Sequence, residues 1–389
     1  MKKGFALAVI LALLVMVGLP LSADGHERWD GADDLAVNPL ACGMGDAMME
    51  DDSDAMMDGD AGEDMGMVEY DGGQPAMMDM DMAGMDITLV DVPKLVGIGY
   101  FAATTLGQKQ AAEELGNVNV TTDAPTEANI DDQIQVIDTY ITQGVDGILF
   151  AANDPVAIAP VLRKALEAGI HVVGYDANSE PDAREWFVNQ AEFNGIAKAL
   201  VDSLADQMGA DAAFGIVTST FTTPNQARWI AEMWAYASEC YPDLTWLETL
   251  EAQEDAVLSF QQAQTLINKY GEDMDGIFAM TSVATPNSAD AVQQAGLCGD
   301  IAVVGLATPN GMKPYVNDGC VRDVVLWNPV DLGYAAVYVT RAVVDGELMP
   351  GDSSVMAGRL GELMVVNGSE VLLGPPFVFN ADNINDFDF

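Results

Sequence analysis

From about residue 92 onward, short apolar runs alternate with longer segments in which apolar residues recur every three or four positions. This alternation predicts strands connected by amphipathic helices, the order of elements that forms a parallel sheet covered on both faces. Gly116, Gly144 and Gly169 stand where helices are expected to end. The predicted strands are residues 117–121, 147–150 and 172–175, and the predicted helices are residues 130–143 and 156–168.

The same alternation repeats in the second half of the chain and predicts a second α/β lobe. Its strands are predicted at residues 213–217, 247–250, 276–279 and 301–304, with helices at 226–239, 257–270 and 288–296. A last strand, residues 323–326, leads through Trp327, Asn328 and Pro329 into a helix at 331–344 that is expected to return to the first lobe. Such a return of the chain forms a hinge between two lobes.

The stretch 93–107 is predicted to be a buried strand with an aromatic pair at its end, followed by a helix that begins at Gly107. Where a strand gives way to a helix, the free N–H groups of the helix and the last side chains of the strand face one crevice, the usual ligand position in an open α/β sheet. Lys94, Tyr100 and Phe101 are therefore predicted to form the first wall of a small-molecule site. The alternative, that Tyr100 and Phe101 are ordinary core aromatics, stays open.

The N-terminus has the pattern of a secretory signal peptide over residues 1–23: Lys2 and Lys3, an apolar run at 5–19, and a small-residue site at 21–23. The mature chain is expected to begin near Asp24, outside the cytoplasm. A retained membrane anchor is the alternative, although the apolar run is short for a membrane span.

Residues 24–91 are rich in Asp, Met, Gly and Ala and contain almost no Lys or Arg. Such a segment cannot offset its ordering entropy by burial, so it is predicted to be a disordered tether that makes no packed contact with the lobes. Because thioethers suit Cu(I), metal scavenging by the Met-rich runs is the alternative to a solvated spacer.

The charge balance excludes several classes of partner. The chain contains 15 Lys and Arg but 61 Asp and Glu, so its formal net charge is −46. This charge argues against nucleic acid and anionic membranes as partners. Of the two histidines, His26 lies in the tether and His171 begins a strand, so neither a catalytic triad nor a zinc site is expected. No phosphate-binding loop of the Walker type occurs. We therefore expect no enzyme activity, no cofactor and no metal.

The four cysteines fit an exported protein. Cys298 and Cys320 each precede a strand of the second lobe, and a disulfide between them is expected. Cys42 and Cys240 are then either unpaired or joined, and the sequence leaves both possibilities open.

Four groups of residues carry a family resemblance. They are PKLVG at 93–97, DAPTE at 123–127, GLATPN at 305–310 with PYV at 314–316, and LWNPVDLGY at 326–334. With them, the chain from about Val92 to its end resembles the type I periplasmic sugar-binding proteins of ABC transporters, in the branch that contains rhamnose-binding and autoinducer-2-binding proteins. The resemblance implies two doubly wound parallel-sheet lobes, joined by a multi-strand hinge, that close on a ligand and deliver it to a membrane permease.

The resemblance also suggests where the lobes divide. The first lobe is expected to comprise residues 92–190 and 327–379, and the second lobe residues 191–326 and 380–389. The protein is expected to be a monomer that binds a small sugar.

Ligand contacts of the autoinducer-2-binding members carry over unevenly. Lys94 and Asp176 match, while the Asp-Gln pair of those members is Asn225-Gln226 here, and Met280 and Ser282 stand where a proline and an alanine are expected. The Trp327-Asn328-Pro329 sequence is more similar to the rhamnose-type relatives. The resemblance therefore favours a rhamnose-like monosaccharide, with autoinducer-2 as the alternative.

The chemistry of these residue types agrees with a sugar site. Asp176 follows a predicted strand, where its carboxylate can accept hydrogen bonds from two vicinal hydroxyls. The amides of Asn225 and Gln226 both donate and accept, as hydroxyls do. Phe101 and Trp327 can cover the apolar faces of a sugar ring. Asn225 as a simple helix cap is the alternative.

Overall fold

The computed structural model describes residues 37–42, 69–75 and 83–389. The predicted signal peptide, His26 and the Met-rich runs of the predicted tether lie outside these residues. The strands are β1 Ile87–Val92, β2 Val118–Thr122, β3 Gly147–Phe150, β4 His171–Tyr175, β5 Trp186–Asn189, β6 Ala213–Thr218, β7 Thr245–Glu251, β8 Gly276–Ala279, β9 Ala302–Leu306, β10 Val324–Leu326, β11 Ser354–Met356, β12 Glu362–Val366, β13 Glu370–Leu372 and β14 Phe377–Phe379.

The α-helices are α1 Gly99–Leu115, α2 Ile130–Gln143, α3 Ala159–Glu167, α4 Phe193–Met208, α5 Pro224–Cys240, α6 Ala256–Tyr270, α7 Ala284–Ala295, α8 Pro309–Asn317 and α9 Pro329–Val344. None of the helices in the described part of the chain has the length and apolarity that a membrane span requires.

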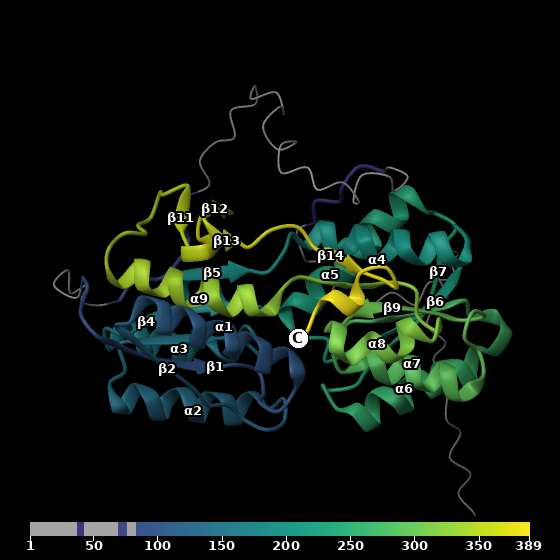
Figure 1. Ribbon diagram of the computed structural model, residues 1–389, viewed down its shortest axis with the longest axis horizontal. Coiled ribbons are helices and arrows are strands. Elements are labelled where there is room, and N and C mark those ends of the chain that lie inside the picture. The colour runs from purple at the N-terminus through teal and green to yellow at the C-terminus, as the bar shows by residue number, and fades with distance from the viewer. Residues whose placement is uncertain (1–36, 43–68, 76–82) are drawn as a thin grey trace, which may run out of the picture.

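The strands form two sheets, one in each lobe (Figure 1). The first sheet has eight strands in the order β11-β12-β13-β5-β4-β3-β1-β2, and the second has six in the order β14-β10-β9-β8-β6-β7. The strands from β1 to β5 pair in parallel, as do those from β6 to β10. The predicted α/β class with two parallel-sheet lobes is confirmed.

Helices cover both faces of the first sheet, which explains the unbroken apolar runs of its strands. Val90 and Val92 of β1 belong to a core with Ile137 of α2 and Leu162 of α3. Leu89, which points to the opposite face, belongs to the core that includes residues of α1 and α9. Because β1, β3 and β4 are parallel neighbours, their carboxyl ends lie next to one another at one edge of the sheet.

The predicted strand and helix start in the stretch 93–107 are wrong. The strand β1 ends at Val92, residues 93–98 form a connection, and α1 begins at Gly99, so Tyr100 and Phe101 lie in the first turn of a helix. Gly107 lies in the middle of α1, where a Cβ atom would come within 1.8 Å of the Val330 carbonyl oxygen. This glycine permits close packing of α1 on α9 and does not start a helix.

Within residues 83–389, the chain crosses between the lobes three times, between β5 and α4, between β10 and α9, and between β13 and β14. The helix α9 packs against α1 and β4 of the first lobe. One predicted boundary is wrong: β14 pairs with β10 of the second sheet, so the chain leaves the first lobe before residue 377 and not after residue 379.

Two described parts of the predicted tether contact the lobes, which corrects the expectation of a segment without packed contacts. Cys42 is disulfide-bonded to Cys240 of α5 in the second lobe. Tyr70 packs on Trp186 of β5 in the first lobe, with ring centroids 5.3 Å apart. The tether also ends earlier than predicted, because β1 begins at Ile87.

Candidate ligand-binding cleft

The centre of the candidate site is an ion pair at the carboxyl edge of the first sheet. Lys94 lies in the connection after β1, and Asp176 directly follows β4. The Lys94 ammonium is 3.0 Å from Asp176 Oδ2, and both side chains are about 5% exposed or less. Asp176 Oδ1 accepts hydrogen bonds from the Tyr100 hydroxyl (2.9 Å) and from the amide of Asn225 (3.3 Å).

Asp176 has a left-handed backbone, with φ of 60°. Asp and Asn adopt this region more readily than other non-glycine residues, and strain of this kind is concentrated at functional sites. The turn directs the carboxylate across the end of the sheet, toward the second lobe.

The second lobe contributes two amides from the first turn of α5. Asn225 Oδ1 accepts a hydrogen bond from the Lys94 ammonium at 3.4 Å, which links the two lobes. Gln226 Oε1 accepts from the Thr218 hydroxyl and from the Ser219 N–H, at 2.6 and 2.7 Å. These bonds fix Gln226 at the end of β6, and its amide nitrogen donates to Glu254 Oε1 at 3.3 Å.

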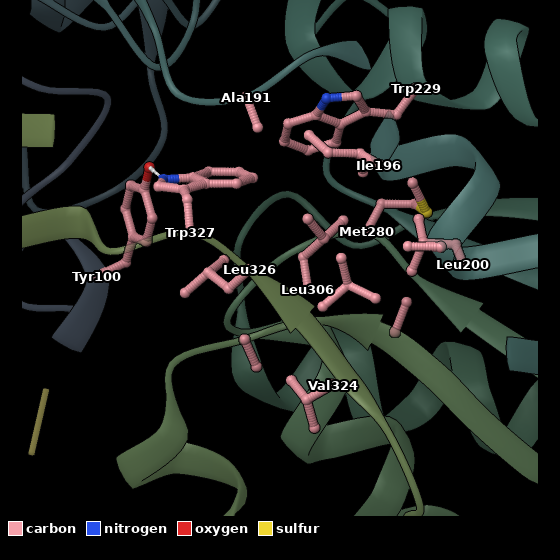
Figure 2. Packing of buried hydrophobic residues seen from close by; sticks show 14 of the residues in the cluster. Tyr100, Ala191, Ile196, Leu200, Trp229, Met280, Leu306, Val324, Leu326 and Trp327 are labelled. Atoms are coloured by element: carbon pink, nitrogen blue, oxygen red, sulfur yellow. Dashed lines mark hydrogen bonds between the residues drawn. The ribbon is translucent and has the colours of Figure 1, made fainter. Parts of the chain in front are cut away.

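Aromatic rings form a second wall of the cleft. The Trp327 indole N–H donates to the Tyr100 hydroxyl at 3.0 Å (Figure 2). The Trp327 ring lies 6.1 Å from the Tyr100 ring and 5.7 Å from the ring of Trp229 on α5. Burial, together with the Asp176 charge, raises the pKa of Tyr100 well above its usual value, so this hydroxyl acts as a donor.

These side chains enclose a small cavity of about 30 Å³ between the lobes. That volume is close to one water molecule, whereas ligand pockets measure roughly 300 Å³ or more. Lys94, Asp176 and Asn225 bond to each other across the gap. Entry of a sugar therefore requires the lobes to part.

The structure brings together all but one of the residues predicted for the site. The cavity is lined by Lys94, Tyr100, Phe101, Asp176, Asn225, Gln226, Met280, Ser282 and Trp327. Asn328 is the exception, because its side chain caps α9 by accepting from the N–H groups of Val330 (2.9 Å) and Asp331 (3.4 Å). The prediction of Asn328 as a ligand contact is therefore corrected to a helix cap.

Six further lining residues were not predicted: Ile98, Trp229, Glu254, Thr281, Leu306 and Leu326. Trp229 lies one helical turn beyond Asn225 on α5, so the spacing of four residues was a signal that could have found it. Glu254 lies in the connection between β7 and α6, where no motif marks it. Burial raises the pKa of Glu254, against the opposite effect of the Lys94 charge.

The remaining titratable and cysteine residues lie elsewhere. His171, at the start of β4, is 3.0 Å from the carboxylate of Glu185 and does not line the cleft. Cys298 and Cys320 are joined by a disulfide, and Cys42 and Cys240 by a second one. Within residues 37–42, 69–75 and 83–389, no cluster of His, Cys, Asp and Glu has the arrangement of a metal site.

A larger cavity of about 370 Å³ lies inside the second lobe. Its lining is mostly apolar, with Phe214, Trp234 and Trp246 among the aromatic residues, and contains no charged side chain. Without convergent polar groups, this cavity is a poorer match to a polyhydroxylated ligand than the cleft between the lobes.

Comparison with known proteins identifies the family. A model of the periplasmic binding protein domain matches residues 90–348. The chain belongs to this family. Its solved relatives include a sugar ABC transporter protein from Actinomyces odontolyticus, which is 31% identical, with 82% of this chain and 100% of that chain covered and a TM-score of 0.64.

A second solved relative is an ABC transporter solute-binding protein from Clostridium phytofermentas with bound L-rhamnose. It is 30% identical, with 78% of this chain and 98% of that chain covered and a TM-score of 0.74. A D-ribose/D-allose-binding protein of Pseudomonas aeruginosa is 26% identical over 212 residues, 50% of this chain. The match spans 62% of the length of that curated relative.

These proteins are transport proteins and not enzymes, and membership of the family implies a location outside the cytoplasm. The resemblance predicted from the sequence motifs is confirmed.

Proposed function

We propose that this protein is the solute-binding component of an ABC importer and that it captures a rhamnose-like monosaccharide between its lobes for delivery to the permease. The observation that carries the proposal is the buried pair of Lys94 and Asp176 at the cleft, bonded to Asn225 of the opposite lobe. Each of these groups bonds to another protein group that a sugar hydroxyl can replace.

Binding in this account exchanges protein contacts for ligand contacts. When the lobes part, the ammonium of Lys94 can donate to a sugar oxygen, and the carboxylate of Asp176 can accept from two hydroxyls. Asn225, which now donates to Asp176 and accepts from Lys94, can do the same with vicinal hydroxyls. The rings of Trp327 and Phe101 supply apolar area for the faces of the sugar.

Closure around the sugar favours a neutral polyol over a ligand with few hydroxyls. A buried polar group without a partner costs about 1–3 kcal/mol, so each hydroxyl that the cleft expects and the ligand lacks weakens binding by that amount. In this proposal the protein acts as a monomer outside the cytoplasm. Its N-terminal segment is the export signal or the membrane anchor.

Uptake of autoinducer-2 is the second candidate, because Lys94 and Asp176 match the pattern of autoinducer-2-binding members. Against it stand Asn225 in place of an Asp, and Met280 and Ser282 in place of a proline and an alanine, all of which line the cleft. Half of the pattern is therefore absent, and a monosaccharide is the better match.

A thermal-shift screen of monosaccharides and autoinducer-2 tests the proposal. A ligand that binds only the folded state stabilises it by about 2.7 kcal/mol at one hundred times its dissociation constant. We expect L-rhamnose or a close relative to raise the unfolding temperature by several degrees. If only autoinducer-2 does so, the second candidate is correct, and if no compound does so, the proposed function is wrong.

A further inference from the structure

Glu254 is placed in the cleft by an unusual backbone. It lies in the connection between β7 and α6, and both Gln253 and Glu254 have left-handed conformations, with φ of 52° and 54°. Two successive non-glycine residues in this region are strained, and such strain is maintained where the surrounding structure imposes it, commonly at ligand sites. The strained turn brings the side chain of Glu254 to the lining of the cavity.

One oxygen of the Glu254 carboxylate has a partner and the other does not. Oε1 accepts a hydrogen bond from the Gln226 amide at 3.3 Å. Oε2 is buried and receives no hydrogen bond of good geometry from the described residues, although the hydroxyl of Thr281, on the same cavity wall, is near enough to lower the pKa of Glu254. A buried carboxylate oxygen without a donor is unfavourable, and a ligand hydroxyl in the cleft supplies the missing donor.

The charges of the cleft leave this carboxylate unneutralised. Among the described residues that line the cavity, Lys94 is the one cation, and its ammonium pairs with Asp176 at 3.0 Å. Glu254 is then a second carboxylate facing a single positive charge. Hydroxyl donors suit such a group, because a hydrogen bond to a charged acceptor is stronger than one to a neutral acceptor.

We propose that Glu254 is a ligand-contacting, specificity-determining residue whose Oε2 accepts a hydrogen bond from one hydroxyl of the bound sugar. This inference rests on the proposed function. It adds a third recognition element, from the β7–α6 connection of the second lobe, to Asp176 of the first lobe and Asn225 of α5.

Calorimetric titration of the full chain with L-rhamnose, or with the sugar that gives the largest shift in the thermal screen, tests the inference. We expect Glu254→Gln to weaken binding about tenfold and Glu254→Ala about thirtyfold or more, because the amide keeps the size but loses the charge. The control, Glu272→Gln, removes the same charge from an exposed position of the same lobe and leaves the affinity unchanged.

Monodeoxy analogues of the same sugar separate direct contact from support of Gln226. If Glu254 holds a hydroxyl, the analogue that lacks this hydroxyl binds the parent about tenfold more weakly, yet binds Glu254→Ala nearly as well as the full sugar does. If every analogue loses the same factor in both proteins, or if Glu254→Gln binds the sugar as tightly as the parent, the inference is wrong. Failure of the parent to bind any sugar would instead reject the proposed function.

Discussion

Asn225 lies between the two charges of the cleft and bonds to both. Its Nδ2 donates to Asp176 Oδ1 at 3.3 Å, and its Oδ1 accepts from Lys94 at 3.4 Å. Only a group that is both donor and acceptor can make these two bonds. The amide is thus matched to its neighbours and not only to a ligand.

We predict that Asn225→Asp weakens sugar binding about tenfold, because the new carboxylate cannot donate to Asp176 and like charges repel in a buried site. Autoinducer-2 binding should not appear, since Met280 and Ser282 are unchanged. Titration with L-rhamnose and with autoinducer-2 measures both effects. Asn119→Asp, at an exposed position of β2, is the control. Unchanged sugar affinity in Asn225→Asp would contradict the role given to this amide.

Asp91 is a buried carboxylate in β1, beneath the cleft. Its Oδ1 accepts from the Tyr175 hydroxyl at 2.8 Å, and Tyr175 immediately precedes Asp176. Burial raises the pKa of Asp91 from 3.8 to about 6, although the hydrogen bond from Tyr175 lowers it. The folded state therefore holds this proton more tightly than the unfolded state, and the group destabilises the fold as pH rises from 4 to 6.

We predict that Asp91→Asn removes this penalty. A rise of two pKa units corresponds to about 3 kcal/mol, which is absent below pH 4 and complete above pH 6. The stability of Asp91→Asn relative to the parent should therefore increase by about that amount between pH 4 and 6.5, as measured by urea unfolding. The exposed variant Asp300→Asn should show a constant difference. A constant difference for Asp91→Asn as well would show that this carboxyl is ionised without penalty.

Residues at the ends of buried strands could be predicted from the sequence, whereas those in irregular connections could not. Asp176 directly follows an apolar run, so its place at the sheet edge follows from the strand. Asn328 precedes Pro329 at the start of a helix. At such a position the sequence does not distinguish a helix-capping residue from a ligand contact. Glu254 reaches the cleft through two left-handed residues, and neither is a glycine that would signal such a turn.

At the scale of elements, the contact of α1 with α9 depends on two glycines. A Cβ atom at Gly107 would lie 1.8 Å from the Val330 carbonyl oxygen, and one at Gly333 would lie 2.0 Å from the Thr104 carbonyl oxygen. Both clashing atoms belong to the backbone, so a change of side-chain rotamer cannot relieve the clash. The two helices can approach this closely only because both positions lack side chains.

We predict that Gly107→Ala destabilises the protein by about 2 kcal/mol or more, since the helices must move apart and open the core between them. Gly99→Ala is the matched control on the same helix. The nearest atom to a Cβ there is the Thr308 hydroxyl at 3.9 Å, so the change should be neutral or slightly stabilising. Urea unfolding of the two variants compares them. Equal midpoints would show that the helix contact is not as tight as the structure indicates.

Two of the strands buried on both faces were predicted accurately, whereas β1 was assigned to the tether and β5 was not predicted. The strands β3 and β8 have the predicted bounds, because every residue in them is buried and the apolar run is unbroken. The strands β11 and β12 gave no such run, since they are short and expose Met356 and Met364. The start of α1 was missed because its N-cap, Ile98, makes no side-chain capping bond and carries no sequence signal.

At the scale of the whole molecule, the N-terminal region is attached to both lobes. Asn38 and Cys42 contact the second lobe, through the Glu232 carboxylate and the disulfide to Cys240. In the first lobe, the Tyr70 hydroxyl donates to the Glu185 carbonyl oxygen at 2.9 Å. These contacts could not be predicted from the composition of residues 24–91, because the few residues that make them are greatly outnumbered by Asp and Met.

We predict that Cys42→Ser/Cys240→Ser lowers the free energy of unfolding more than Cys298→Ser/Cys320→Ser does. The first disulfide closes a sequence separation of 198 residues and the second one of 22, which correspond to roughly 5 and 3 kcal/mol of chain entropy. Sugar affinity should be unchanged in both variants, since neither bond lines the cleft. An unaltered unfolding midpoint for the Cys42/Cys240 variant would contradict the attachment.

The most direct test of the sugar-binding cleft is calorimetric titration of Asp176→Ala with L-rhamnose, beside the parent and the surface control Glu272→Gln. Loss of the carboxylate leaves two sugar hydroxyls without an acceptor and Lys94 without its partner at 3.0 Å. The account predicts binding at least about 100-fold weaker than in the parent, with the control unchanged. If Asp176→Ala binds the sugar as tightly as the parent, the cleft at Lys94, Asp176 and Asn225 is not the site.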